Sequence, residues 1–248
     1  MRVLALDSSG LVASVAVVEG KEGNADACTI AEYTVNYKKT HSQTLLPMLD
    51  EVAKMTDLDL ASIDAVAVAA GPGSFTGLRI GSATAKGLGL ALEKPLIPVP
   101  TLEGLAYNLC GMGGLVCPIM DARRGQVYTG IYRFQDGEHL TVVEDQMAVS
   151  IEELGEKLKA YKEEVTFLGD GVPVFREVLE TQILKGERIR FAPANMNRQR
   201  AASVGALGLI YYKEGKTQTA EEHKPDYLRV SQAERERKER MEHDTVSM

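Results

Sequence analysis

The glycine-rich segment from Gly71 to Gly81 constrains the fold of this chain most. It has the sequence GPGSFTGLRIG, follows the apolar stretch 64–68 and continues directly into a helical pattern. A strand, a glycine turn and a helix start suggest an anion site, because the first amides of a helix point outward at the positive end of its dipole. The glycine spacing is one residue too long for a dinucleotide fingerprint, and no Lys-Ser or Lys-Thr pair follows to make a P-loop. A structural turn is therefore favoured, with phosphate binding as the alternative.

The helix after this turn is unusually rich in glycine, and each helical glycine costs about 0.8 to 1 kcal/mol relative to alanine. Four of its small residues are spaced by four, namely Gly77, Gly81, Ala85 and Gly89. Residues at this spacing form one smooth ridge along a helix, which another backbone can approach closely. The ridge is predicted to contact another helix. Packing of the ridge inside the chain, against the sheet, is the alternative that the sequence supports equally.

Composition places the chain among ordinary globular proteins. It has 248 residues, of which 44% are hydrophobic and 25% charged, and its net charge of −7 argues against nucleic-acid binding through a broad basic face. The absence of a long apolar run and the early Asp7 predict a cytoplasmic chain without membrane contact. The three cysteines form no C-x-x-C motif and the four histidines no H-x-x-x-H motif, so no metal site is expected.

The first hundred residues show a strand and helix pattern that indicates the fold class. Strands are expected at 3–6, 12–18, 29–35, 66–70 and 96–99. An amphipathic helix around 45–53 has Ser42 or Thr44 as a candidate N-cap, and Pro47 should lie in its first turn. With the glycine-rich helix, the order is β-β-β-α-β-α-β. We therefore predict an α/β, actin-like ATPase (ASKHA, ribonuclease-H-like) fold of two related β-sheet domains flanked by helices.

The second half of the chain shows a further set of patterns. Helices are expected at 102–109, 151–161 and 175–184, and strands at 115–120, 126–134 and 165–168. Asn197 is a candidate cap for a last helix that Gly215 ends.

The change of pattern near residue 101 predicts a division into domains. Residues 1–100 with about 197–217 are expected to form the first ribonuclease-H-like domain, and residues 101–196 a smaller second domain. Residues 218–248 are expected to form a C-terminal extension, which is highly charged from residue 232.

Six motifs occur in order along most of the chain. They are LDSS at 6–9, THSQTLLP at 40–47, GPGSFTGLRIG at 71–81, AKGL at 85–88, DAR at 121–123 and PDYLR at 225–229. Together these motifs resemble the TsaB (YeaZ) family, and the glycine motif followed by Lys86-Gly87 is the most specific of them. The resemblance implies an actin-like two-domain fold and a role in forming N6-threonylcarbamoyladenosine on tRNA, next to the anticodon.

The resemblance also implies partners. It describes an accessory subunit that docks onto TsaD, the paralogue that carries the metal and the transfer chemistry, while the ATPase TsaE joins the complex. It implies a homodimer when the chain is isolated, tRNA contact mainly through the complex, and ATP used by the complex with no cofactor bound by this chain alone. Docking should involve the helix after the His-Ser motif and the glycine-rich helix. The expected interface residues are His41, Ser42, Leu45, Leu46, Leu49, Val52, Gly77, Leu78, Gly81, Ala85 and Gly89.

A smaller set of residues is predicted as possible nucleotide or anion contacts. It consists of Asp7, Ser8, Ser9, Gly71, Gly73 and Arg79. Asp7 follows a strand at the place where actin-like ATPases bend around phosphate, although an aspartate that caps a turn explains it equally well. Arg79 opposes the helix dipole and suggests an anionic partner, which a carboxylate of the same chain would also provide.

No catalytic residue and no metal ligand is assigned from the sequence. His41 is conceivable as a general base, but a capping or interface histidine is the stronger interpretation. A stand-alone actin-like ATPase or a metallopeptidase-like enzyme remains the alternative function.

Overall fold

The N-terminal hundred residues form a mixed five-stranded sheet in the order β3-β2-β1-β4-β5. Its strands are β1 (Arg2–Asp7), β2 (Ala13–Glu19), β3 (Cys28–Val35), β4 (Ala65–Gly71) and β5 (Leu96–Pro100). β1 pairs antiparallel with β2 and parallel with β4. Both β1 and β4 are buried on their two faces, which is why their sequences are continuously apolar and do not alternate. The computed structural model describes residues 1–20, 27–37, 40–135 and 139–228.

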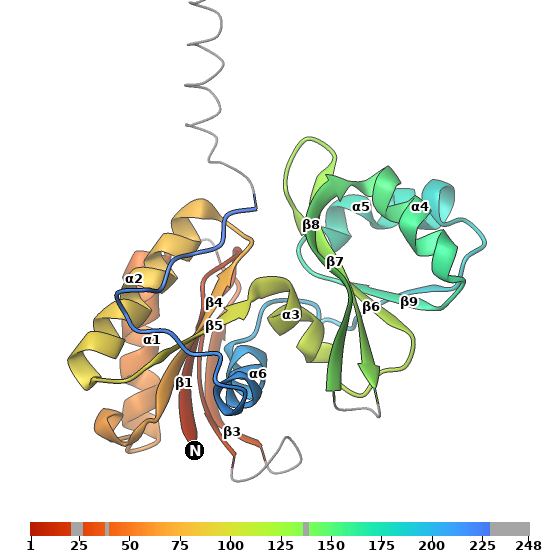
Figure 1. Cartoon of the computed structure of the whole chain (residues 1–248). Helices are drawn as coiled ribbons and strands as arrows, with labels where there is room; N and C mark the ends of the chain where they lie inside the picture. The colour runs from red at the N-terminus through yellow and green to blue at the C-terminus, as the bar shows by residue number, and fades with distance from the viewer. Residues whose placement is uncertain (21–26, 38–39, 136–138, 229–248) are drawn as a thin grey trace, which may run out of the picture.

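Helices cover both faces of this sheet (Figure 1). On one face lie α1 (His41–Met55) and α2 (Phe75–Leu92), which share a core with Leu4 and Leu6 of β1. On the other face lie α3 (Thr101–Ala106) and α6 (Ala201–Lys213), which pack against Val3 and Ala5. The alternation of side chains along one strand thus divides the core into two layers. Short 3-10 turns at Leu60–Ser62 and Tyr107–Leu109 complete this half.

A second five-stranded sheet has the order β10-β9-β6-β7-β8. Its strands are β6 (Leu115–Asp121), β7 (Gln126–Gln135), β8 (His139–Ser150), β9 (Val165–Leu168) and β10 (Ile189–Phe191). Its outer face is covered by α4 (Ile151–Tyr161), α5 (Val172–Val178) and a π-helical turn at Leu179–Ile183. α3 and α6 lie between the two sheets (Figure 1).

The two sheets have the same topology. In each, three strands joined in sequence pair antiparallel, and two further strands add parallel to the first strand of the three. β6 therefore corresponds to β1, α4 to α1 and α5 to α2. This confirms the predicted fold of two related sheets flanked by helices, although the sequence shows no internal repeat.

The predicted domain limits at residues 100, 196 and 217 stay a prediction, because one core cluster joins the two sheets. It contains Val3 and Ala5 of the first sheet together with Tyr132 and Leu168 of the second. The charged tail from residue 232 lies outside the described residues. In the part of the chain that the structure describes, no helix is long and apolar enough to cross a membrane.

Several local predictions were wrong. β8 and β10 were not predicted, because β8 is half-exposed with two register shifts against β7 and β10 has only three residues. α1 begins at His41 with Thr40 as N-cap, so Ser42 and Thr44 are not its cap and Pro47 lies in the second turn. The N-cap of α6 is Arg200 and not Asn197.

The glycine ridge of α2 faces the chain's own sheet. A Cβ atom on Gly77 would lie 2.0 Å from the carbonyl oxygen of Ser8, and one on Gly81 2.5 Å from the Ser8 hydroxyl. A Cβ on Gly89 would lie 2.9 Å from Leu96, and Ala85 is fully buried. The intramolecular alternative therefore holds, and the prediction that this ridge contacts another helix is wrong.

Replacement by alanine is expected to have opposite effects at a packed glycine of α2 and at an exposed one. In Gly77→Ala the added methyl group would collide with the carbonyl oxygen of Ser8. We expect this substitution to lower the free energy of unfolding by about 1 to 3 kcal/mol. Nothing lies within 4 Å of a Cβ on Gly87, so Gly87→Ala should raise it by up to about 1 kcal/mol. Urea unfolding of both variants measures the two effects, and a shift of both in the same direction would contradict this packing.

Candidate functional site

The motifs that are dispersed along the sequence meet in one cleft between the two sheets. The cleft has a volume of about 740 Å³. The first sheet contributes the turn after β1, the start of α1 and the turn between β4 and α2. The second sheet contributes the ends of β6 and β9, and residues 226–228 form a further wall. The polar and aromatic side chains that line it are Ser9, Thr40, His41, Ser74, Phe75, Thr76, Asp121, Arg123, Tyr128, Asp170, Asp226 and Tyr227.

Asp7 lies beneath the cleft at the end of β1 and is bound by its own turn. Its Oδ1 accepts hydrogen bonds from the backbone N–H of Ser9 at 2.9 Å and from the Ser9 hydroxyl at 2.7 Å. Burial raises the pKa of Asp7 to about 6, although these hydrogen bonds and nearby His41 act in the opposite direction. Two donors of this turn, the N–H and the hydroxyl of Ser9, are therefore already bound to the chain's own carboxyl group.

The glycine turn between β4 and α2 presses against the same turn. The N–H of Ser74 donates to the Ser9 carbonyl at 2.7 Å, and a Cβ on Gly73 would lie 2.3 Å from that oxygen. Gly71 has φ of +122°, and a Cβ there would lie 2.1 Å from the carbonyl oxygen of Asp226. The glycines thus allow close approach of the chain's own backbone, which supports the structural interpretation of this turn.

The second sheet repeats the arrangement at the end of β6. Oδ1 of Asp121 accepts the N–H of Arg123 at 2.8 Å, as Asp7 does from Ser9. The N–H of Asp121 in turn donates to Oδ1 of Asp170 at 3.2 Å, and burial raises the pKa of Asp170. Asp121 also forms an ion pair with Arg123 at 3.3 Å, but the Arg123 side chain is 86% exposed, so this ion pair contributes little to stability.

His41 lies where the sequence placed it, at the start of α1, and lines the cleft. Its Nε2–H donates to the carbonyl oxygen of Gly10 at 2.8 Å, which links α1 to the β1–β2 turn. This contact positions α1 and does not cap the helix, and an interface role of His41 stays a prediction.

Arg79 does not face the cleft. Its guanidinium lies 3.9 Å from the ring centroid of Phe75, and its Nε is 3.4 Å from the hydroxyl of Tyr227. The rings of Phe75 and Tyr227 are themselves 4.8 Å apart. The guanidinium of Arg79 therefore contacts two aromatic side chains, whereas the sequence suggested that it binds an anion or a carboxylate.

Most of the predicted interface residues are covered by the chain itself. Leu45, Leu49, Val52, Gly77, Leu78, Gly81, Ala85 and Gly89 are all buried. The prediction that these eight contact a partner is wrong, because their side of each helix packs against the sheet. Ser42 and Leu46 are exposed and His41 is half-buried.

Sequence reasoning missed three residues of the cleft. Asp170 was not singled out, and Asp226 and Tyr227 appeared only within a motif, although all three line the cleft. The correspondence of Gly169-Asp170-Gly171 with Gly71-Pro72-Gly73, both between a parallel strand and a helix, was the signal that could have found Asp170. Within the described residues, no group of three or more His, Cys, Asp or Glu could hold a metal ion.

Comparisons with known proteins give the family. A family model described as TsaD, tRNA N6-adenosine threonylcarbamoyltransferase, matches residues 29–237. The chain is 35% identical over 234 residues to the tRNA threonylcarbamoyladenosine biosynthesis protein TsaB of Bacillus subtilis, covering 94% of this chain and 96% of that protein. It is 30% identical to the protein of the same name from Escherichia coli, covering 92% and 95%. The chain belongs to the TsaB (YeaZ) family.

A solved structure agrees with this assignment. YeaZ from Pseudomonas aeruginosa superposes with a TM-score of 0.76 at 26% identity, covering 92% of this chain and 99% of that one. The motifs on which the resemblance to the TsaB family rested are those that meet around the cleft and along α2.

The burial of Asp7 predicts a pH-dependent effect of its substitution. A carboxyl whose pKa is raised on folding contributes most stability below its unfolded value of 3.8 and loses it as the pH rises through about 6. Asp7→Asn removes this loss and should raise the free energy of unfolding by on the order of 2 kcal/mol at pH 7.5, with little effect at pH 4. Urea unfolding at the two pH values measures it, with exposed Asp57→Asn as control. An equal effect of Asp7→Asn at both pH values would contradict the account.

Proposed function

We propose that this chain is the accessory subunit of the bacterial complex that forms N6-threonylcarbamoyladenosine on tRNA. In this role it binds the catalytic subunit TsaD and supports the recruitment of the ATPase TsaE. Family membership supports the pathway, because the relatives from Bacillus subtilis and Escherichia coli are named for the biosynthesis of this nucleoside. The complex acts in the cytoplasm, contacts tRNA mainly through its other subunits, and uses ATP that this chain alone does not bind.

The outer face of α2 is the surface that we propose binds TsaD. Ala83, Gly87 and Ala91 are exposed, lie four residues apart and are uncharged. The neighbouring helix α1 exposes Leu46, which is 54% accessible. α1 and α2 lie side by side on the outside of the first sheet (Figure 1).

Gly87 is the single observation that favours a partner on this face. It lies in the interior of a helix, where glycine costs about 1 kcal/mol relative to alanine. Nothing within the described chain approaches it, since a Cβ there would meet no atom within 4 Å. A closely approaching partner backbone explains a glycine at this position, and the same surface serves a homodimer when TsaD is absent.

The geometry of the cleft supports an accessory role. At both hairpin turns the N–H two positions after the strand-end aspartate donates to that aspartate: Ser9 to Asp7 and Arg123 to Asp121. A stand-alone ATPase needs such donors for the phosphates of its substrate. We therefore assign the transfer chemistry and its metal to TsaD.

A bulky charge on the outer face of α2 should abolish docking without unfolding the chain. We expect Ala83→Arg to weaken binding to TsaD from the same source at least tenfold, which is about 1.4 kcal/mol. The matched control is Ala160→Arg, since Ala160 is an exposed alanine of α4 on the other sheet. Titration calorimetry measures both affinities.

Two outcomes of this titration would contradict the proposal. If the unchanged chain does not bind TsaD, the accessory role is wrong. If it binds and Ala83→Arg binds as tightly as Ala160→Arg, the partner uses another surface.

A further inference from the structure

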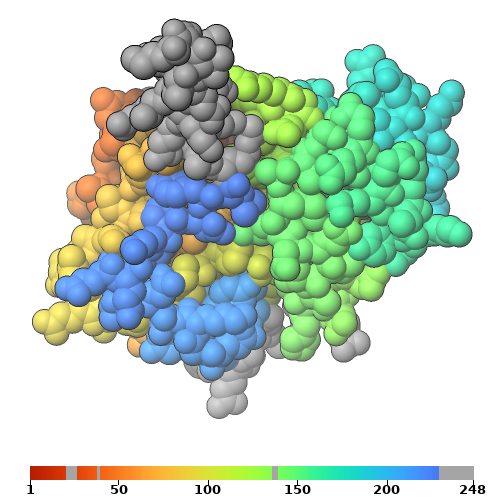
Figure 2. Space-filling model, turned by 45° about the horizontal axis from the view of Figure 1, so that its top comes forward, coloured from red at the N-terminus to blue at the C-terminus, as the bar shows by residue number. Residues whose placement is uncertain are grey.

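The segment after α6, residues 217–228, forms a strap across the first sheet. It passes the edge strand β5, follows α2 and ends at the cleft. Figure 2 shows it lying over α2 and reaching the border with the second sheet. Residues 217–220 and Glu222 line one side of a pocket at the end of α2, and residues 226–228 line the cleft. The strap thus connects the flank of α2 to the wall of the cleft.

Both ends of the strap are held by backbone hydrogen bonds. Gln218 and Leu96 exchange two bonds of 2.9 Å, which add one antiparallel bridge to the edge of β5. The N–H of Asp226 donates to the carbonyl of Ala70 at 2.7 Å. Between these points Ala220 is buried in the core beneath α2.

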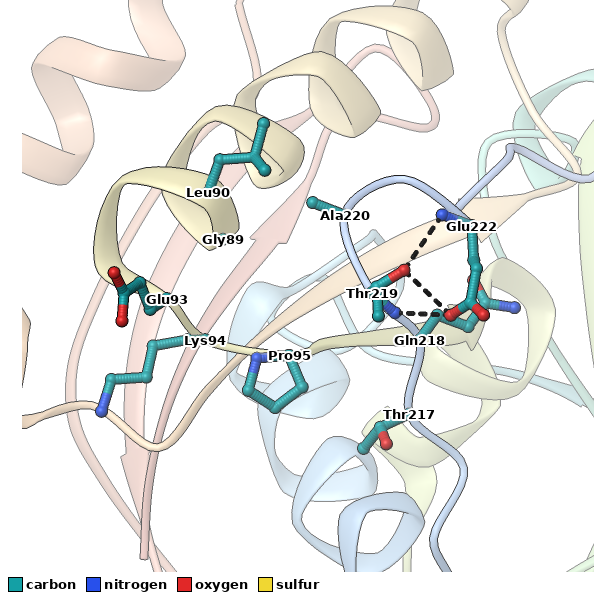
Figure 3. Close-up of a pocket in the computed structure, with 10 residues that line it drawn as sticks. All are labelled: Gly89, Leu90, Glu93, Lys94, Pro95, Thr217, Gln218, Thr219, Ala220 and Glu222. Atoms are coloured by element: carbon teal, nitrogen blue, oxygen red, sulfur yellow. Dashed lines mark hydrogen bonds between the residues drawn. The ribbon is translucent and has the colours of Figure 1, made fainter.

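A capped turn directs the middle of the strap inward. Glu222 accepts from the N–H and the hydroxyl of Thr219, both at 2.9 Å, and its own N–H donates back to that hydroxyl at 3.2 Å (Figure 3). This reciprocal pattern is a capping box. The N–H of His223 closes the turn on the carbonyl of Thr219 at 3.2 Å. The pocket beside this turn has a volume of about 440 Å³.

His223 is the fully buried residue of the strap, at 0% exposure. Its Nδ1 lies 3.3 Å from Oε1 of Gln218 and can only donate to it, so the neutral ring carries its proton there. Its Nε2 is buried with no hydrogen-bond partner among the described residues. A second proton would therefore create a buried cation whose new N–H has no acceptor.

The charges around His223 disfavour protonation of its ring. Lys86 of α2 acts on the ring and, together with burial, lowers the pKa of His223 from its ordinary value of 6.5. On the strap itself, Glu222 is exposed and bound to Thr219, and Lys224 is exposed. The carboxylate of Glu222 is thus engaged elsewhere, and a protonated ring would lie beside a lysine.

We propose that the strap is a pH-sensitive latch, which protonation of His223 releases from α2 and from the wall of the cleft. A histidine whose pKa is lowered in the closed state favours closure fully above 6.5. As the pH falls below that value, the open strap binds the proton more readily and closure weakens. Release withdraws Asp226 and Tyr227 from the cleft and uncovers the flank of α2.

Amide hydrogen exchange of the full chain tests the latch directly. We compare the protection of the Gln218 and Asp226 amides at pH 7.5 and pH 5, each corrected for the intrinsic exchange rate. At least a tenfold loss of protection is expected at pH 5, while the Leu6 amide in β1 stays protected. The ring of His223, followed by NMR, should titrate below 6.5 with the same midpoint.

Three variants separate the latch from other titrations. His223→Gln keeps a neutral side chain at every pH and should remove the pH dependence, whereas exposed His139→Gln should leave it unchanged. Lys86→Met keeps His223 in place and should move the midpoint to higher pH, which tests the proposal even if His223→Gln does not fold. The measurement is repeated in Asp7→Asn, because Asp7 titrates near pH 6.

The latch is refuted by any of three results. These are constant protection between pH 7.5 and pH 5, an equal loss in His223→Gln, or a loss that disappears in Asp7→Asn.

Discussion

The contact between two backbone turns, residues 8–9 after β1 and residues 71–77 after β4, determines how the rest of the molecule is arranged. Side chains at Gly73 and Gly77 would collide with the carbonyl oxygens of Ser9 and Ser8, so only glycines let α2 start this close to β1. Because α2 starts at this position, its ridge of small residues faces the sheet and the opposite side of the helix faces outward. The same contact sets one wall of the cleft, and the strap then packs against it through Asp226.

The cleft between the two related sheets is built from two turns that are held by the chain's own carboxyl groups. Two hairpin turns of the same kind face each other across it, and in each an aspartate accepts the N–H of the residue two positions on. The first turn is stabilised by the two hydrogen bonds that Ser9 donates to Asp7 and does not wait for a ligand. Gly87, which internal packing leaves unexplained, lies on the outer side of α2.

Local patterns in the sequence predicted a large part of this architecture. Apolar periods and turn residues predicted the order of strands and helices along the first hundred residues, including the strand, turn and helix around Gly71. The direction of the ridge could not be decided, because it depends on the contact of Gly77 with Ser8, 69 residues away. Asp170, Asp226 and His223 lie in segments that only tertiary contacts bring to the cleft or to α2. β10 is too short for any periodic signal, and the repeat of the two sheets exists in topology alone.

The central claim is that Asp7 and Asp121 bind the Ser9 and Arg123 amides of the two cleft turns, which supports the proposed role as a binding subunit. Titration of the isolated chain with Mg-ATP, followed by amide NMR shifts of Ser9 and Arg123 and by calorimetry, tests this most directly. The account predicts no saturable shift of either amide at millimolar nucleotide. Saturable binding with Kd below about 100 µM that moves both amides would contradict it.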